Sequence, residues 1–201
     1  MDPTTAVRTD AIEVIATVIA PGAYASAPYM WAVLAQSHEW RDFLEKHEAI
    51  ALASAILAWT VAGFVVESVG TYAEYYLIDR KRPDHAAMLA NWWRYLQITW
   101  AKDKEPIGQH YLRRTLVSFK FELNMATACV GSMPGWLLLG LIGVLSGLQS
   151  IDVVILSWIA ALGLFSMART SAGVLAEVRE RLLAVADEQA KNAITRSGGV
   201  F

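Results

Sequence analysis

Charge and cysteine are both scarce in this sequence. Asp, Glu, Lys and Arg make up 18% of the 201 residues, whereas soluble domains contain about 25%. Cys129 is the single cysteine, so an internal disulfide is excluded, and a lone thiol in an apolar run packs as a small hydrophobic side chain. The net charge of −2, taken alone, suggests that the chain has no nucleic-acid partner.

Sequence motifs of enzymes and metal sites are absent as well. The chain has no Cys-x-x-Cys pair, no Gly-rich phosphate loop and no Gly-x-Ser-x-Gly elbow. On the helices that we expect in the cytoplasm, no histidine lies three or four residues from an acidic residue or another histidine, which is the spacing of helical metal ligands. We therefore expect no metal and no cofactor.

The first ten residues lack the basic start and the cleavage site of a signal peptide. We therefore expect the first apolar segment to be retained as a membrane span.

Apolar residues are abundant and gathered in blocks. They make up 55% of the chain, and the mean hydropathy is +0.36. Because a helix needs about 20 apolar residues to cross a bilayer, the blocks predict an all-α, integral membrane four-helix bundle. The expected spans are 11–35, 49–69 with its helix continuing to about 78, 124–145 and 151–168. The tight hairpin between the last two is expected at 146–150.

This pattern divides the chain into four regions. Residues 1–78 form a first transmembrane pair, 79–120 a helical loop, 121–170 a second transmembrane hairpin and 171–201 a C-terminal amphipathic helix and tail. Basic residues are sorted between the loops: nine lie in 79–120, five from Arg169 onward and one at Arg8, which is fifteen of the 17. By the positive-inside rule, both termini and the 79–120 loop are expected in the cytoplasm, in a plasma (bacterial inner) membrane.

The first span is rich in prolines and small residues. Pro21, Gly22, Ser26 and Pro28 lie within it and predict a kink or a cavity-lining surface. A broken helix, a re-entrant helix and an ordinary kinked helix are all compatible with this composition.

Carboxylates near the cytoplasmic boundary suggest a polar belt. Gly63, Glu67, Gly70 and Glu74 follow at spacings of four, three and four and share one helix face. A carboxylate at that depth is costly unless it is paired, hydrated or protonated. The expected belt or gate comprises Glu67, Glu74, Glu122, Asn124, Arg113, Arg114, Lys120 and Arg169. Such a belt serves either as an ion pathway, gate or catalytic group, or as a salt-bridge ring that sets helix register.

Small residues four apart predict close helix packing. The packing candidates are Gly63, Gly70, Gly131, Gly135, Gly143 and Gly147. Contacts within one chain and between copies give the same pattern. Four short spans enclose little of a pathway alone, so we expect a homo-oligomer.

The 79–120 loop carries an aromatic stripe. Trp92, Trp93 and Trp100 lie on one face of a predicted helix, edged by basic residues. This composition suits a helix at the lipid headgroups or a surface for a cytoplasmic protein partner. A second amphipathic helix is predicted from Gln109, and a third over 172–193, beyond the last span.

Three functions are compatible with these features. The first is a non-enzymatic, homo-oligomeric pore, sensor or effector switched from its cytoplasmic side, an outline shared by channels, assembly factors and membrane effectors of bacterial defence. The second is a scaffold that recruits a partner through the Trp-rich loop. The third is a membrane-embedded enzyme acting on a lipid or amphiphile through Glu67, Glu74, Glu122 and His110; missing catalytic motifs weigh against it.

Overall fold

The computed structural model describes residues 11–80, 86–87, 90 and 109–197, and every element within them is helical. In chain order the elements are η1 (Ile15–Ile19), α2 (Ala20–Gln36), α3 (His38–Lys46), α4 (Glu48–Ala73), η2 (Glu74–Asp79), α6 (Gln109–Leu141) and α7 (Gly147–Ser197). The prediction of an all-α protein is confirmed for this part of the chain. The Trp-rich stripe lies outside it.

Three of the described helices are long and apolar enough to cross a membrane: Ala11–Gln36, Glu48–Asp79 and Gly147–Val185. They support a transmembrane protein. Helix α6, expected to hold the third span, is not among the three. Its apolar residues are diluted by Asn124, Ser132 and Pro134 and by several glycines.

The first helix is continuous through both of its prolines. The π-helical turn η1 leads directly into α2, so the backbone stays helical over Ala11–Gln36. A proline at position 21 has no N–H for the carbonyl of Thr17, four residues earlier, and its ring crowds that carbonyl. The wider π turn lies where this conflict arises. A broken helix is therefore not what the structure shows.

Helix α3 is a short amphipathic link between α2 and α4. Ser37 caps it, accepting a hydrogen bond from the Trp40 amide at 3.4 Å. Arg41 reaches back and donates to the Leu34 carbonyl at 3.1 Å, near the end of α2. None of its residues is buried, and Trp40 and Phe43 are exposed. The Ser37 cap and the Arg41 hydrogen bond thus hold this link against the end of α2.

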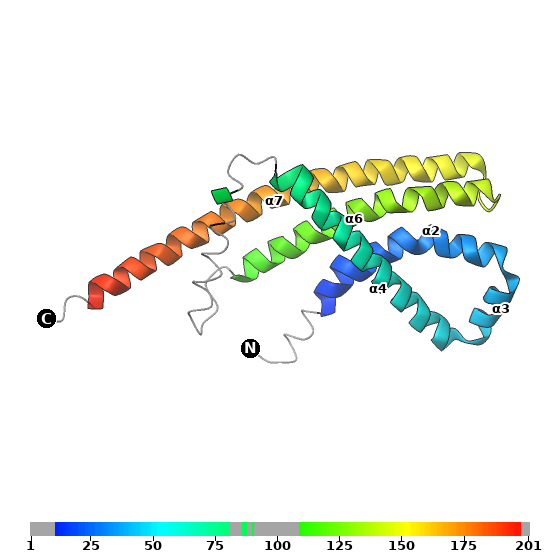
Figure 1. Ribbon diagram of the computed structural model, residues 1–201, viewed down its shortest axis with the longest axis horizontal. Helices are drawn as coiled ribbons and strands as arrows, with labels where there is room; N and C mark the ends of the chain where they lie inside the picture. Colours follow the sequence, from blue (N-terminus) through cyan, green and yellow to red (C-terminus); the bar gives the residue numbers. More distant parts are fainter. Residues whose placement is uncertain (1–10, 81–85, 88–89, 91–108, 198–201) are drawn as a thin grey trace.

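Helices α6 and α7 form an antiparallel hairpin and pack more extensively than any other pair of elements (Figure 1). The expected hairpin at 146–150 is wrong by about four residues. Gly143 turns the chain with a φ of 75°, which favours glycine. Ser146 then starts α7 with a capping box: its hydroxyl accepts from the Gln149 amide at 3.2 Å, and Gln149 Oε1 accepts from the Ser146 amide at 3.0 Å.

Helix α7 is much longer than a bilayer crossing. Its 51 residues span about 77 Å at 1.5 Å per residue, whereas the hydrocarbon core is about 30 Å thick. The second half packs on the first half of α6: Leu112, Phe119, Leu175 and Leu183 are buried in one cluster. The last turns of α7 extend past all other described helices (Figure 1). The apolar stripe predicted for 172–193 therefore begins as a contact within the chain.

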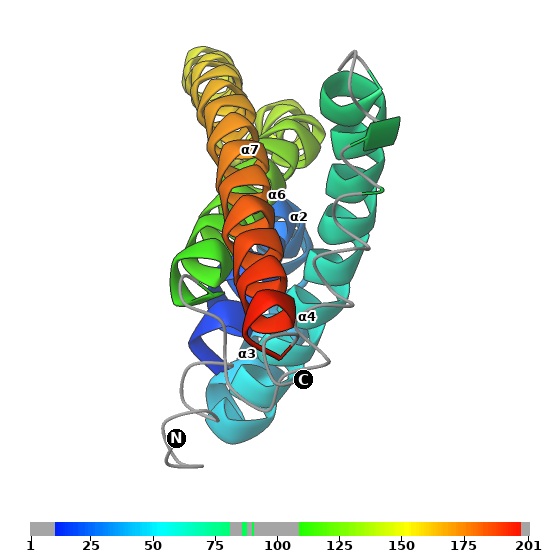
Figure 2. The same cartoon turned by 90° about the vertical axis from the view of Figure 1, so that its left-hand side faces the viewer.

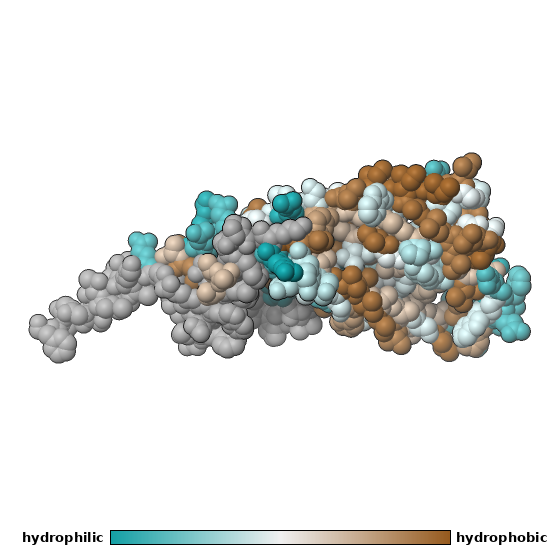
Figure 3. Space-filling model, turned by 45° about the horizontal axis from the view of Figure 1, so that its top comes forward, coloured by the Kyte–Doolittle hydropathy of each residue, from teal (hydrophilic) through white to brown (hydrophobic). Residues whose placement is uncertain are grey.

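The outer surfaces of these helices are strongly apolar. Leu57 in α4, Val65 in α4 and Leu156 in α7 are each more than 60% exposed. Apolar residues cover much of the face that Figure 3 shows, over the end that holds the α6–α7 turn. Soluble monomers rarely expose contiguous apolar patches beyond a few hundred Å², so this surface is suited to lipid.

Candidate functional site

Polar contacts between helices gather on one part of α6. Four of them use residues within 113–124, about 16 Å of the helix at 1.5 Å per residue, and they reach the first helix, η2 and α7. We call these four contacts the polar belt.

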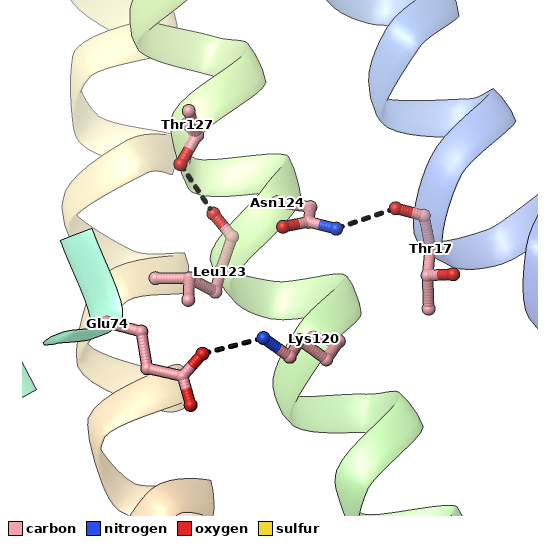
Figure 4. A network of polar contacts seen from close by, with 6 residues as sticks. All are labelled: Thr17, Glu74, Lys120, Leu123, Asn124 and Thr127. Atoms are coloured by element: carbon pink, nitrogen blue, oxygen red, sulfur yellow. Dashed lines mark hydrogen bonds and ion pairs between the residues drawn. The ribbon is translucent and has the colours of Figure 1, made fainter. Parts of the chain in front are cut away.

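The first contact joins η2 to α6. Lys120 Nζ lies 2.6 Å from Glu74 Oε2, and about a quarter of each side chain is exposed (Figure 4). Glu74 opens the π-helical turn that ends the α4 helix. The sequence had placed both residues in one belt, and the structure brings them into direct contact.

The second contact joins the first helix to α6 through a buried amide. Asn124 is 1% exposed, and its Nδ2 donates to the Thr17 carbonyl at 2.7 Å (Figure 4). That carbonyl is the one that Pro21 cannot serve, because proline has no N–H. Asn124 Oδ1 has no hydrogen-bond partner among the described residues and would lie 2.7 Å from a Cβ placed on Gly70. The proline, the asparagine and the glycine thus form one packing unit.

The third contact joins α6 to α7. Glu122 is 7% exposed and accepts hydrogen bonds from Ser118 Oγ at 3.1 Å and Ser171 Oγ at 2.7 Å. Within the described ranges no cation pairs with it. A buried carboxylate needs such donors, because an unpaired charge in an apolar interior is costly. Glu122 is therefore held by two hydroxyls and is largely shielded from solvent.

The fourth contact was missed by the sequence analysis. Arg113 Nε lies 2.6 Å from Glu13 Oε1, and Arg113 Nη2 lies 2.9 Å from Glu13 Oε2. This is the two-pronged geometry that makes arginine–carboxylate pairs strong. The sequence analysis did not place Glu13 in the expected belt. The position of Glu13 at the start of the first span, on the side where the basic loop was expected, was the available signal.

Other expected members stand outside the belt. Glu67 is half-buried, and no described residue bonds to it; Arg114 and Arg169 are exposed and make no ion pair with any described residue. His110 lies in the first turn of α6, but its side chain is outside the described part, as are Trp92, Trp93 and Trp100.

The expected kink residues pack against neighbouring helices. A Cβ on Gly22 would lie 1.9 Å from the Trp59 carbonyl oxygen, and one on Gly63 would lie 2.2 Å from the Val18 carbonyl oxygen. These two glycines mark the crossing of the first helix and α4. Ser26 Oγ donates to the Gly22 carbonyl at 2.7 Å, within its own helix.

The expected packing glycines of α6, of α7 and of the turn between them fall into three groups. A Cβ on Gly135 would lie 2.7 Å from Pro28 Cγ, so these residues meet where α2 crosses α6. Nothing lies within 4 Å of a Cβ placed on Gly131 or Gly147, and Gly143 shapes the turn described above. The sequence spacing alone did not separate these cases.

No carboxylate of the belt lines either of two apolar grooves formed by the described helices, one between α4, α6 and α7 and one between α2, α3 and α4. Glu67, which stands outside the belt, lines neither groove. Among the residues described, no group of three or more His, Cys, Asp or Glu side chains is arranged to hold a metal ion. No protein-family model, curated protein or solved structure matches this chain.

Proposed function

We propose that this chain is a non-enzymatic, homo-oligomeric four-span protein of the bacterial inner membrane. It acts as a sensor or effector, a pore included, and is switched from its cytoplasmic side through the polar belt. The observation that carries this proposal is that α6 is bonded to the first helix, to η2 and to α7 within about three turns. If the first half of α6 and the second half of α7, which pack together, are displaced, these bonds pass the displacement to every other candidate span.

The fourth span in this proposal is the second half of α6. A five-residue turn joins α6 to α7, and the two helices pack side by side. If the apolar part of α7 lies in lipid, then the antiparallel stretch of α6 beside it lies at the same depth. Its backbone hydrogen bonds run within the helix, as lipid requires, except at Pro134, which has no N–H for the Val130 carbonyl. Asn124 and Ser132, which lower its hydropathy, are buried against other helices.

An even number of spans supports the proposed orientation. With four crossings, the basic segment 79–120, the N-terminus and the α7 extension share one side, in agreement with the sorting of Lys and Arg. Arg113 and Lys120 then lie at the cytoplasmic surface. Their pairing with Glu13 and Glu74 joins residues that this topology places at one depth.

The switch itself is a packing equilibrium. The Ser171 hydroxyl on Glu122 and the leucine cluster around Leu175 hold α7 against α6. A ligand, partner or membrane change that favours a shifted α7 must also shift the paired carboxylates of the belt. Such a stimulus acts only through its different affinity for the two arrangements. Buried, satisfied contacts of this kind favour two discrete states over gradual deformation.

The homo-oligomer is supported by the exposed faces of the spans. Only 11% of the most apolar stretch of Glu48–Asp79 is buried within the chain. On its outer half, Ser54 and Ala58 are small and exposed. Small residues four apart let a second helix approach closely in lipid.

Charge exchange tests the proposal in liposomes. Lys120→Glu is expected to change ion flux or the oligomeric state of the purified chain, and Glu74→Lys with Lys120→Glu to restore the wild-type value. Arg114→Glu is the matched control, because Arg114 is exposed without an ion pair to a described residue. A chain that stays monomeric, conducts no ions and ignores all three changes would contradict the proposal.

A membrane scaffold is the second candidate, favoured by the length of α7. The helix extends past the other described elements, and Glu177, Glu180 and Arg181 are exposed along it. If the protein recruits a cytoplasmic partner through this extension and the Trp-rich loop, then Trp92→Ala with Trp93→Ala should lose partners in a pull-down. Unchanged partners would remove this alternative.

A further inference from the structure

An apolar groove opens between α4, α6 and α7. Its volume is about 490 Å³, and its lining includes Val69, Ala73, Gly131, Trp158 and Phe165. The one hydroxyl in the lining, on Thr127, donates to the Leu123 carbonyl at 3.0 Å. Apart from the indole N–H of Trp158, the side chains of this lining are therefore apolar toward an occupant. In Figure 2, α4 is inclined relative to the α6–α7 pair.

On α7, Arg169 continues the line of the groove. Trp158, Leu162, Phe165 and Arg169 follow at spacings of four, three and four, so they share one face of α7. The first three line the groove, and Arg169 lies one turn, about 5.4 Å, beyond Phe165 toward the polar belt. Arg169 is exposed and forms no ion pair with a described residue. Lys120, the basic residue next to the groove on α6, is already bonded to Glu74.

We propose that this groove binds an acyl chain of an anionic phospholipid and that Arg169 holds the lipid phosphate. The two halves of the site match the two halves of such a lipid: an apolar slot at hydrocarbon depth and, at its end, a guanidinium that forms no ion pair within the described part of the chain. Arginine suits this role because its planar fork donates two hydrogen bonds to a phosphate. A helix from a second copy could fill the slot, but its apolar face would leave Arg169 without a counter-charge. This inference requires only that α4, α6 and α7 lie in lipid, so it does not depend on the proposed switch.

Trp158 provides a reporter inside the groove. The full chain is reconstituted in phosphatidylcholine vesicles that contain an equal fraction of either brominated phosphatidylglycerol or brominated phosphatidylcholine. Because the chain has eight tryptophans, Trp158→Phe supplies the background to be subtracted. We expect the anionic brominated lipid to quench Trp158 at about fivefold lower concentration, the effect of one basic residue at an anionic surface.

Variants of Arg169 test the headgroup contact. Arg169→Gln should abolish the preference for the anionic lipid while leaving quenching by the zwitterionic lipid, and Arg169→Lys should keep most of the preference. Arg114→Gln is the control: Arg114 precedes the groove residue Leu123 by nine residues, or two and a half turns, and so points away from the groove.

A variant of Gly131 tests whether the acyl chain binds in the groove. No atom of the described residues lies within 4 Å of a Cβ placed on Gly131, so Gly131→Leu can fill the groove without a backbone clash, and leucine favours the helix. We expect it to reduce quenching by both brominated lipids. Gly163→Leu is the matched control, because Gly163 is equally free of neighbours and does not line the groove.

Three results would overturn the inference. Equal quenching by the two lipids would remove the role of Arg169. If Gly131→Leu leaves the quenching unchanged, the acyl chain does not bind in the groove. Trp158 shielded from both lipids, together with efficient disulfide cross-linking between copies that carry Val69→Cys, would show that a second copy of the chain occupies the groove.

Discussion

At the crossing of the first helix and α4, Gly63 has no room for a side chain. A Cβ there would lie 2.2 Å from the Val18 carbonyl oxygen, and backbone atoms cannot rotate away. We expect Gly63→Ala to lower the free energy of unfolding by about 1–3 kcal/mol, the usual cost of overpacking. Unfolding in mixed micelles by SDS titration measures this change.

Gly163→Ala is the control for that experiment. A Cβ on Gly163 would meet nothing within 4 Å, and alanine favours a helix by up to about 1 kcal/mol over glycine. The two glycines should therefore respond with opposite signs. Equal responses would mean that the two helices do not cross at Gly63.

Glu122 also depends on its immediate neighbours. Its carboxylate is buried, and its described hydrogen-bond donors are the hydroxyls of Ser118 and Ser171. Ser171→Ala removes the shorter bond, and we expect a loss of about 1–3 kcal/mol, the cost of leaving a buried polar group unsatisfied. Glu122→Gln keeps an oxygen acceptor and removes the buried charge, so it should cost less. A larger loss for Glu122→Gln would show that the negative charge itself is required.

At the scale of elements, the long apolar helices were predictable and their irregular turns were not. Hydropathy alone predicts α4 and α7, because lipid leaves no alternative to a helix for an uninterrupted apolar segment. Composition could not show that Pro21 stays inside a continuous helix, because the carbonyl it leaves free is served by Asn124, more than 100 residues later in the chain. The start of α7 was readable in principle: Ser146 and Gln149 have the spacing of a capping box.

For the polar belt too, part of the arrangement was predictable from the sequence and part was not. Depth along the spans suggested that Glu74 and Lys120 lie near each other, but sequence spacing could not assign partners between helices. Glu67 shares a helix face with Glu74 and yet bonds to no described residue, because the partner must come from another element. Which of the two carboxylates, Glu67 or Glu74, has a partner depends on how α6 packs against their helix.

The contact between Asn124 and Thr17 provides a test of how two elements are joined. In Pro21→Ala the new N–H can serve the Thr17 carbonyl, so Asn124→Ala should cost less in that background than in the wild type. We expect a coupling free energy of about 0.5–1.5 kcal/mol, the range of hydrogen bonds between membrane helices. A double-mutant cycle of unfolding free energies measures it. Strictly additive effects would contradict the link between the proline and the asparagine.

For the whole molecule, the decisive question is whether α6 crosses the membrane. It packs along α7 and is joined to it by the turn at Gly143, so the two helices should lie at the same depth. Tyr111 and Gln149 are exposed, and only α6, the turn and the first residues of α7 separate them. In a Cys129→Ser background, a membrane-impermeant maleimide should label Gln149→Cys in intact cells and Tyr111→Cys only after the membrane is permeabilised. Arg41→Cys in α3 is the control for the outer side, because four crossings place it with Gln149. If Tyr111→Cys and Gln149→Cys react from one side, then α6 does not cross, and the chain has three spans with its termini on opposite sides.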